Sequence, residues 1–283
     1  ATELVGTAGA TDAPAGALLG LLDAGDAVVD FEPVYDSYRA GIALASATPV
    51  PVPLEPDETG RYVFDPTALR DAVTDRTKII LLNTPHNPTG KVFDRAELEL
   101  VAEVAKEHDL IVVTDEVYEH LVFDGREHIP MATLPDMFER TLTISSGGKT
   151  FHTTGWKIGW MSGPANLVTA AKTAKQFLTY VTGAPVHPSM ETGLRMGDDY
   201  FDRLRGDLQT ARDHLVDGLR RAGFTTLVPE ATYFVTVDIR SVRLDGNGVD
   251  FCRELPHTAG VVAVPSEAFY INTEAGRHLV RFA

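Results

Sequence analysis

The stretch of sequence that decides the fold runs from residue 78 to residue 118 and reads KIILLNTPHNPTGKVFDRAELELVAEVAKEHDLIVVTDEVY. Its two ends, residues 78–83 and 110–114, are short apolar runs typical of strands buried on both faces. Between them Asp94 can cap a helix, with Glu97 three residues later as in a capping box. An apolar stripe then follows at helical spacing, formed by Leu98, Val101, Ala102 and Ala105. Strand, helix and strand in this order predict an α/β fold with a parallel, doubly wound sheet.

The same alternation extends to both sides of this stretch. DAVVDF at residues 26–31 and RTLTIS at residues 140–145 are two further predicted buried strands. Asp65 followed by Pro66 predicts the start of another helix, because proline is tolerated in the first helical turn. After about Gly197 the pattern changes to one long, charged, amphipathic helix.

The C-terminal part is α+β in character. Its strand-like runs are TYFVTVDI (232–239), VVAV (261–264) and HLVRF (278–282). Asn247-Gly248 is a predicted turn between them. We therefore predict two domains, a large one at residues 1–200 and a smaller, incomplete one at residues 201–283.

The totals of the chain limit its function before any motif is considered. The 283 residues carry a net charge of -15, and a negative surface repels phosphodiester backbones, so we expect no nucleic-acid partner. A single cysteine, Cys252, excludes an internal disulfide framework and indicates a reducing, cytoplasmic compartment. The longest uncharged stretch, Ala40 to Leu54, is shorter than the roughly 18 apolar residues of a membrane span. The chain begins without Met and in mid-pattern, from which we expect a fragment of a longer protein.

A nucleotide site and a metal site are weighed as alternatives. In the stretch TISSGGKTFHTTGWKIGW (143–160), residues 148–150 read Gly-Lys-Thr, the ending of a phosphate-binding P-loop. A P-loop needs glycine at position 143, where this chain has Thr143. No pair of the nine histidines has the spacing of an H-E-x-x-H motif, and His120 and His128 have no obvious partners. We therefore predict neither a nucleotidase nor a metal site.

Polar side chains follow the predicted strands at their carboxyl ends, where open parallel sheets place their ligand sites. Asn87 follows one strand, Asp115 and Tyr118 follow the next, and Lys149 comes shortly after a third. An amide, a carboxylate, a phenol and a lysine suit an aromatic, phosphorylated cofactor with a carbonyl group better than ATP. In that arrangement the carboxylate faces a ring nitrogen, the amide and the phenol face a ring hydroxyl, and the lysine faces an aldehyde.

Four blocks of the chain resemble the signature blocks of pyridoxal-phosphate-dependent aminotransferases of fold type I, class I/II. They are NTPHNPTG, VVTDEVYEHLVF, SSGGKTFHTTGWKIGW and HLVRF, in this order. The resemblance runs from residue 1 to residue 283 and points to the branch of kynurenine/glutamine aminotransferases and N-succinyldiaminopimelate aminotransferases. It implies the fold type I architecture, a mostly parallel doubly wound sheet with a second, smaller domain. It also implies pyridoxal 5′-phosphate as the cofactor.

The resemblance assigns roles at the reacting end of the cofactor. Lys149 would be the Schiff-base lysine, which also moves a proton between the substrate Cα and the cofactor C4′. Asp115 would pair with the pyridine nitrogen and keep it protonated. Asn87 and Tyr118 would hydrogen-bond the 3′-oxygen. From the residues alone, Lys149 can be a solvated lysine, Asp115 a helix cap and Asn87 part of an Asn-Pro turn. Family members often hold such an Asn-Pro bond cis.

The resemblance also assigns the phosphate and the substrate carboxylate. Backbone N–H groups, hydroxyls and one positive charge would bind the phosphate, from Ala10, Thr11, Ser146 and Lys157. Many relatives have arginine where this chain has Lys157. Tyr35 would stack on the ring, although an ordinary core tyrosine explains it nearly as well. Arg281 would bind the substrate α-carboxylate as a bidentate pair.

The implied activity is transfer of an amino group from an L-amino acid to a 2-oxo acid, with 2-oxoglutarate as the expected acceptor. Two alternatives stay open: a carbon–sulfur β-lyase that uses the same cofactor, and a cofactor-sensing, aminotransferase-like domain of a transcription regulator. Members of the family normally work as homodimers with sites at the interface, so a homodimer is expected. The preferred amino-acid donor stays open.

Overall fold

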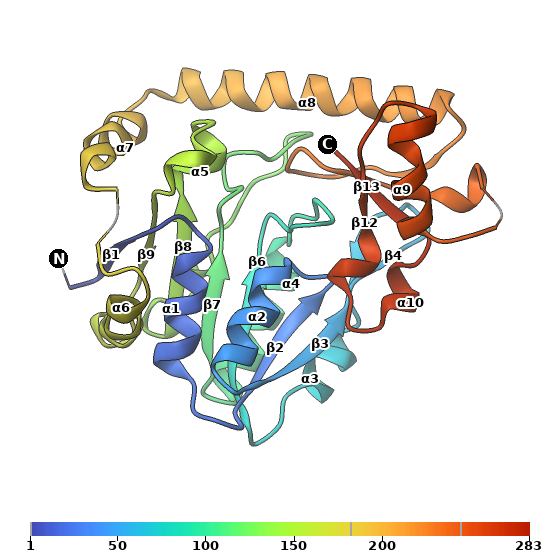
Figure 1. Ribbon diagram of the computed structural model, residues 1–283. Helices are drawn as coiled ribbons and strands as arrows, with labels where there is room; N and C mark the ends of the chain where they lie inside the picture. Colours follow the sequence, from blue (N-terminus) through green and yellow to red (C-terminus); the bar gives the residue numbers. More distant parts are fainter. Residues whose placement is uncertain (1, 182, 244) are drawn as a thin grey trace.

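A large central sheet organises the first two thirds of the chain. The computed structural model describes residues 2–181, 183–243 and 245–283 (Figure 1). The strands of this sheet are β1 (Leu4–Thr7), β2 (Ala27–Glu32), β3 (Thr48–Pro53), β6 (Thr77–Asn83), β7 (Ile111–Asp115), β8 (Thr141–Ser146) and β9 (Gly159–Ser162). Their order is β1-β9-β8-β7-β6-β2-β3. Strands β3, β2, β6, β7 and β8 are parallel, whereas β9 is antiparallel to β8 and β1 to β9. The prediction of a mostly parallel sheet is confirmed.

Helices cover both faces of the sheet, as a doubly wound fold requires. Helices α1 (Asp12–Leu21), α2 (Asp36–Leu44) and α6 (Ala165–Leu178) pack on one face, and α3 (Pro66–Asp71) and α4 (Arg95–Glu107) pack on the other. Side chains that alternate along a strand therefore enter different cores. Val28 of β2 joins the core beneath α1, and Val29 joins the core beneath α4.

The helix starts on the second face follow the predicted capping. Asp94 accepts a hydrogen bond from the Glu97 backbone N–H over 3.0 Å, and the Glu97 side chain accepts one from the Asp94 N–H over 2.9 Å. Asp65 caps α3 by accepting from the Thr67 N–H over 2.8 Å. The apolar stripe of α4 then buries Leu98 and Val101 completely, which stabilises the fold by about 1.5–3 kcal/mol for each side chain.

The edge strand β3 was not predicted, because three of its six residues are prolines. Proline cannot donate a ladder hydrogen bond, so it is confined to edge strands and irregular positions. Here Pro49, Pro51 and Pro53 lie on the outermost strand, which pairs with β2 alone.

A second, smaller sheet follows the long helix. Strands β10 (Thr225–Leu227), β11 (Val235–Asp238), β13 (Leu279–Phe282) and β12 (Val264–Pro265) form it in this order, with all neighbours antiparallel. The accompanying helices are α8 (Asp198–Arg221), α9 (Gly248–Thr258) and α10 (Thr273–Gly276). Short elements complete the chain, namely β4 (Glu55–Pro56), β5 (Tyr62–Val63), α5 (Gly147–Thr150) and α7 (His187–Leu194).

Two details of the C-terminal prediction are wrong. Asn247-Gly248 is not a hairpin turn, because the Asn247 side chain accepts from the Asp250 N–H over 2.8 Å and caps helix α9. Asparagine serves turns and helix caps through the same side-chain oxygen, so the dipeptide alone does not separate them. Of the predicted strand at residues 261–264, only Val264 lies in a strand.

Helix α8 packs against both parts of the chain. Leu204 near its start contacts the cluster of Val117 and Tyr118, whereas Val216 and Leu219 near its end pack on the second sheet. Figure 1 shows the helix crossing above the molecule from α5 to α9. The predicted domain boundary at residue 200 falls inside this helix and stays a prediction. Among the described residues, none of the helices has the length and apolar character needed to cross a bilayer.

Candidate active site

The carboxyl ends of the parallel strands open into a cavity of about 520 Å³. Nine of the ten predicted site residues line it, namely Ala10, Thr11, Tyr35, Asn87, Asp115, Tyr118, Ser146, Lys149 and Lys157. The tenth, Arg281, donates a hydrogen bond from Nη1 to the Asn87 side-chain oxygen over 2.8 Å. Residues almost 200 positions apart in the sequence are therefore neighbours.

The register of the sheet explains how the polar groups meet. Strand β6 ends at Asn83 and pairs there with Asp115, the last residue of β7. The Asn83 amide donates to the Asp115 backbone carbonyl over 2.8 Å, and its oxygen accepts from the Asn87 N–H over 2.6 Å. The next strand, β8, ends at Ser146, and the short helix α5 that follows carries Lys149.

Asp115 is buried and held by two donors. The Tyr38 hydroxyl donates to Oδ2 over 2.7 Å, and the Val117 N–H donates to Oδ1 over 3.3 Å. Burial raises the pKa of the Asp115 carboxyl to about 6, although the Tyr38 hydrogen bond acts in the opposite direction. The alternative role of Asp115 as a helix cap does not apply, because residues 117–120 form a turn and do not begin a helix.

Lys149 points toward the aromatic side of the cavity. Its Nζ atom donates to the Tyr233 hydroxyl over 3.0 Å, and it lies 5.7 Å from the ring centroids of Tyr118 and Tyr233. The lysine and Asp115 both line the cavity. The two groups thus face one common space, as a ring bound between them requires.

Asn87 and Arg281 form a second polar pair beside the cavity. The Asn87-Pro88 peptide bond is cis, as are Glu32-Pro33 and Thr84-Pro85. The Arg281 guanidinium lies 4.2 Å from the Phe234 ring centroid and 4.7 Å from that of Phe269. Aromatic faces attract a cation and fix the plane of the guanidinium. The guanidinium of Arg281 is therefore held in a fixed plane, in which it can donate two parallel hydrogen bonds to a carboxylate.

The opposite end of the cavity is formed by tightly packed backbone. Gly9 has a φ of +77° directly before Ala10 and Thr11, and helix α1 starts at Asp12. A Cβ added at Gly159 would lie 2.6 Å from the Gly9 carbonyl carbon, so this segment and β9 touch through main chain. The free N–H groups at a helix start favour an anion.

Tyr38 and Tyr233 are the two site tyrosines that sequence reasoning missed. A signal existed for Tyr38, since it lies three residues after Tyr35 at helical spacing, and the two rings meet edge to face at 5.6 Å. No local pattern marks Tyr233, because it reaches Lys149 from 84 positions further along the chain.

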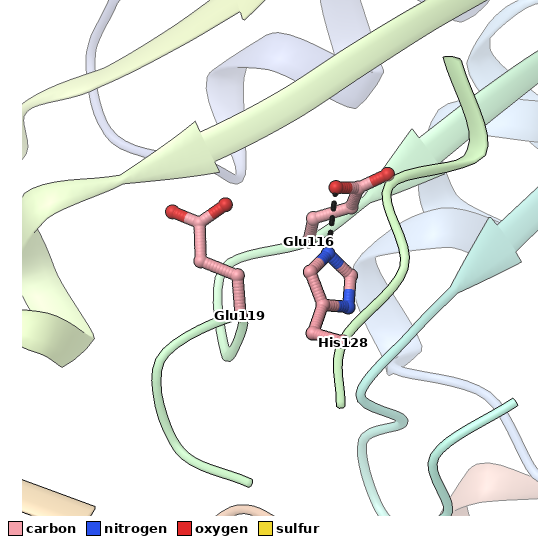
Figure 2. Close-up of side chains that lie close together, drawn as sticks. All are labelled: Glu116, Glu119 and His128. Carbon is pink, nitrogen blue, oxygen red and sulfur yellow. Dashed lines mark hydrogen bonds and ion pairs between the residues drawn. The ribbon is translucent and has the colours of Figure 1, made fainter. Parts of the chain in front are cut away.

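A polar cluster beside the end of β7, in which Glu116 is buried and Glu119 and His128 are half-buried, corrects the prediction that His128 lacks a partner. Figure 2 shows His128 directed at Glu116, with Glu119 on the adjacent turn, and His128 Nε2 lies 2.8 Å from a Glu116 oxygen. The potential ligand atoms of all three lie within 4.8 Å of one another. The Ser145 hydroxyl donates to Glu119 over 2.8 Å, and burial raises the Glu119 pKa to about 7. These contacts form two separate hydrogen-bonded pairs, and the expected absence of a metal stays a prediction.

This fold and this cavity define an aminotransferase that depends on pyridoxal 5′-phosphate. A family model described as aminotransferase class I and II matches residues 1–281, and the chain belongs to this family. The sequence-based assignment of the family, the fold class and the cofactor is confirmed.

The chain is similar to several particular aminotransferases. It is 46% identical over 290 residues to the probable N-succinyldiaminopimelate aminotransferase DapC of Mycobacterium tuberculosis, covering 99% of this chain and 72% of that protein. It is 36% identical over 289 residues to mouse kynurenine–oxoglutarate transaminase 3, covering 94% of this chain and 64% of the relative.

Solved structures agree. The M. tuberculosis N-succinyldiaminopimelate aminotransferase superposes with a TM-score of 0.96 at 46% identity, covering 100% of this chain and 73% of that chain. YbdL from Escherichia coli, for which a methionine aminotransferase function was identified, superposes with a TM-score of 0.93 at 32% identity, covering 100% and 72%.

Proposed function

We propose that this aminotransferase binds its cofactor through Lys149 and moves an amino group from an L-amino acid to 2-oxoglutarate. The observation that carries the proposal is that Asp115 and Lys149 line one cavity together with Asn87 and Tyr118. The kynurenine–oxoglutarate transaminases among the relatives support 2-oxoglutarate as the acceptor.

The residues present fit the cofactor. Asp115 is buried at the end of β7, where a carboxylate can pair with a ring nitrogen, and it is already held by the Tyr38 hydroxyl. Asn87 and Tyr118 offer an amide and a phenol for the 3′-oxygen. The phosphate would lie at the opposite end of the cavity, against the residues predicted for it, which are Ala10, Thr11, Ser146 and Lys157. Tyr35 would cover one face of the ring.

The chain's own groups supply orientation and proton transfer. When bound, pyridoxal 5′-phosphate supplies the electron sink that makes the substrate Cα–H acidic. Lys149, whose amine belongs to the lining of this cavity, would take the proton from the substrate Cα and deliver it to the cofactor C4′. Arg281 binds the substrate α-carboxylate while Asn87 fixes the position of the guanidinium over 2.8 Å. The substrate is thereby oriented with its amino group toward Lys149.

Two further parts of the proposal concern the whole enzyme. We infer that it acts as a cytoplasmic homodimer with amino-acid and 2-oxo-acid substrates, and that its large and small domains meet near residue 200. Phe177 and Tyr180, which are 83% and 72% exposed at the end of α6, support the contact with a second copy.

An absorbance experiment on the full-length protein tests the cofactor link. We expect a yellow protein whose visible band disappears on borohydride treatment, and a colourless Lys149→Ala variant. Lys172→Ala is the matched control, because Lys172 lies on α6 away from this cavity and should leave the band intact. A wild-type protein that stays colourless after reconstitution with pyridoxal 5′-phosphate would overturn the proposal.

A second assay separates transamination from the lyase alternative. The protein is incubated with an S-alkyl cysteine and no 2-oxo acid. A transaminase should then release neither pyruvate nor thiol. Kynurenine, glutamine, methionine and N-succinyldiaminopimelate, each with 2-oxoglutarate, form the donor panel. Glutamate formed with at least one of them is the expected result, and release of thiol without an oxo acid would favour the lyase.

A further inference from the structure

The amine of Lys149 has a neighbour outside the family's signature blocks. The Tyr233 hydroxyl accepts its hydrogen bond over 3.0 Å and is its one hydrogen-bond partner among the residues that the structure describes. The rings of Tyr118 and Tyr233 meet edge to face with centroids 5.9 Å apart. The amine therefore lies beside two phenol rings, and one of the hydroxyls holds it.

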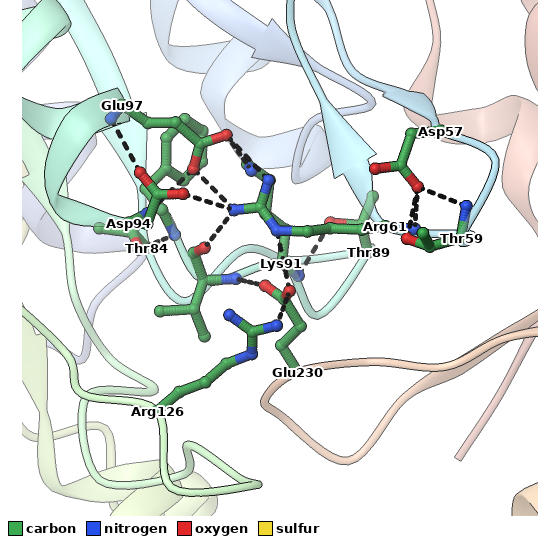
Figure 3. Close-up of polar contacts among 12 residues, drawn as sticks. Asp57, Thr59, Arg61, Thr84, Thr89, Lys91, Asp94, Glu97, Arg126 and Glu230 are labelled. Atoms are coloured by element: carbon green, nitrogen blue, oxygen red, sulfur yellow. Dashed lines mark hydrogen bonds and ion pairs between the residues drawn. The ribbon is translucent and has the colours of Figure 1, made fainter.

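The segment that carries this tyrosine is anchored by Glu230 to loops of the large N-terminal part of the chain. Glu230 accepts from the Val92 N–H over 2.8 Å. As Figure 3 shows, it also pairs with Arg61 and Arg126, over 3.0 Å and 2.7 Å. Glu230 is 8% exposed, so these contacts are shielded from water. The segment that leads to Tyr233 is therefore held in place by contacts with the N-terminal part of the chain, although it belongs to the C-terminal part.

The residue directly before Tyr233 fixes its direction. Thr232 is fully buried, has a φ of +70°, and donates its N–H to the Leu121 carbonyl over 2.9 Å. Its hydroxyl accepts from the Phe234 N–H over 3.3 Å. The constrained backbone at Thr232 thus precedes a tyrosine whose hydroxyl lies 3.0 Å from the Lys149 amine.

We propose that Tyr233 is a positioning residue that holds the Lys149 amine whenever this amine is free. The inference rests on the proposed role of Lys149 and extends it to two occasions, before the cofactor is bound and after an amino-acid substrate has displaced the lysine. The hydroxyl oxygen accepts a hydrogen bond from the amine and so holds it in place. The hydrogen bond also orders the Lys149 side chain in advance, so less rotamer freedom remains to be lost when the amine acts. The amine is thus kept near the position where it acts.

Amine labelling of the cofactor-free protein tests this inference. Limiting acetic anhydride at pH 8 modifies free amines, and mass spectrometry gives the relative rate at each lysine. In Tyr233→Phe we expect Lys149 to be labelled about tenfold faster than in the wild type, because the amine loses the hydrogen bond that holds it. The phenylalanine keeps the ring contact with Tyr118. Lys91, whose side chain is fully buried and paired with Glu97, stays slow if the variant is folded.

Tyr200→Phe is the matched control. The Tyr200 hydroxyl donates to the Thr150 carbonyl over 2.8 Å, so this variant loses a phenol hydroxyl that holds the same short helix as Lys149. We expect labelling of Lys149 within twofold of the wild type. Equal rates in Tyr233→Phe and the wild type, or the same rise in both variants, would overturn the inference.

The two proposals fail separately. Labelling uses no cofactor, so it reports the hold of Tyr233 on Lys149 even if the borohydride experiment assigns the cofactor to another lysine. With cofactor present, loss of the hydroxyl should lower kcat and leave KM for the amino acid within about twofold, because Arg281 and Asn87 are untouched. A purely structural role of Tyr233 would instead change the thermal midpoint and leave the labelling ratio unaltered.

Discussion

Asp115 and Asp30 are buried aspartates on the same sheet with opposite surroundings. Asp115 ends β7 at the cavity and accepts hydrogen bonds from the Tyr38 hydroxyl and the Val117 N–H. Asp30 lies in the middle of β2 and is fully buried, and neither of its carboxyl oxygens has a hydrogen-bond partner among the described residues. One carboxyl is therefore prepared for a ligand, whereas the other is enclosed in the core.

Burial raises the pKa of both carboxyls, but within the described part of the chain only Asp115 has hydrogen-bond donors that lower it again. The Asp115 pKa rises to about 6, because the Tyr38 hydrogen bond partly offsets burial. The Asp30 pKa rises to about 7, with Arg39 lowering it and Glu32 raising it further. A raised pKa by itself does not mark a functional carboxyl. Its place at a strand end, with donors and an open cavity, does.

The largest expected effect is that of Asp115→Asn. The amide removes the negative charge that we assign to the ring nitrogen, and lost stabilisation of this kind costs about 10³-fold in kcat/KM. Steady-state kinetics with the best donor of the panel measures the loss. The visible band of the bound cofactor should persist in a weakened or shifted form.

Asp30→Asn is the matched control for this variant. It makes the same chemical change at a buried position that does not line the cavity. We expect kcat/KM within about threefold of the wild type. A loss at Asp30 as large as that at Asp115 would show that both substitutions act through the sheet and not through the cofactor.

The second effect is on stability, for which we expect the substitution of Asp30, and not that of Asp115, to matter more. The folded chain keeps the Asp30 proton up to about pH 7, whereas an unfolded aspartate loses it near its ordinary pKa of 3.8. Between these values the folded state binds more protons, so the free energy of unfolding falls by about 1.4 kcal/mol per pH unit from this group. Removing the charge should therefore stabilise Asp30→Asn relative to the wild type by about 2–3 kcal/mol more at pH 8 than at pH 5.

Urea unfolding at the two pH values measures this difference. Asp115 and Glu119 also have raised pKa values, but they titrate equally in both proteins and cancel in the comparison. Parallel stability curves for wild type and Asp30→Asn would mean that Asp30 is ionised in the folded chain, with water or Arg39 as its partner.

The sequence predicts the parallel core and most of the cavity because their signals are local. Apolar runs, the Asp94 capping box and the four signature blocks each occupy a short stretch, and parallel strands bring their carboxyl ends to one edge. The edge strand β3 escaped because its prolines read as irregular chain. Helix α9 was missed because Asn247-Gly248 fits a turn as well as a cap.

The unpredicted parts of the site depend on contacts between distant segments. Tyr233 reaches Lys149 because Glu230 and Thr232 hold its segment against loops of the N-terminal part of the chain. The pairing of Glu116 with His128 joins a strand end to a loop 12 positions later, at no regular spacing. Tyr38 had helical spacing from Tyr35, yet its contact with Asp115 spans 77 positions. These partners are brought together by tertiary packing, which no pattern in the sequence reveals.

The smallest of the three effects, and the one that acts most directly on the difference between the two aspartates, is that of Tyr38→Phe. Without the hydroxyl, Asp115 loses the donor that partly offsets burial, so its pKa should rise from about 6 by about one unit, toward that of Asp30. About half of the carboxyl is then protonated at pH 7, so the ring nitrogen loses its charged partner in that fraction, and kcat/KM falls by about twofold at pH 7 but hardly at all at pH 9. Carbon-13 NMR of aspartate-labelled, cofactor-free protein measures the titration of Asp115 directly. If this titration is unchanged while activity falls, Tyr38 acts through ring packing, and the hydrogen bond does not explain why one buried aspartate is functional and the other is not.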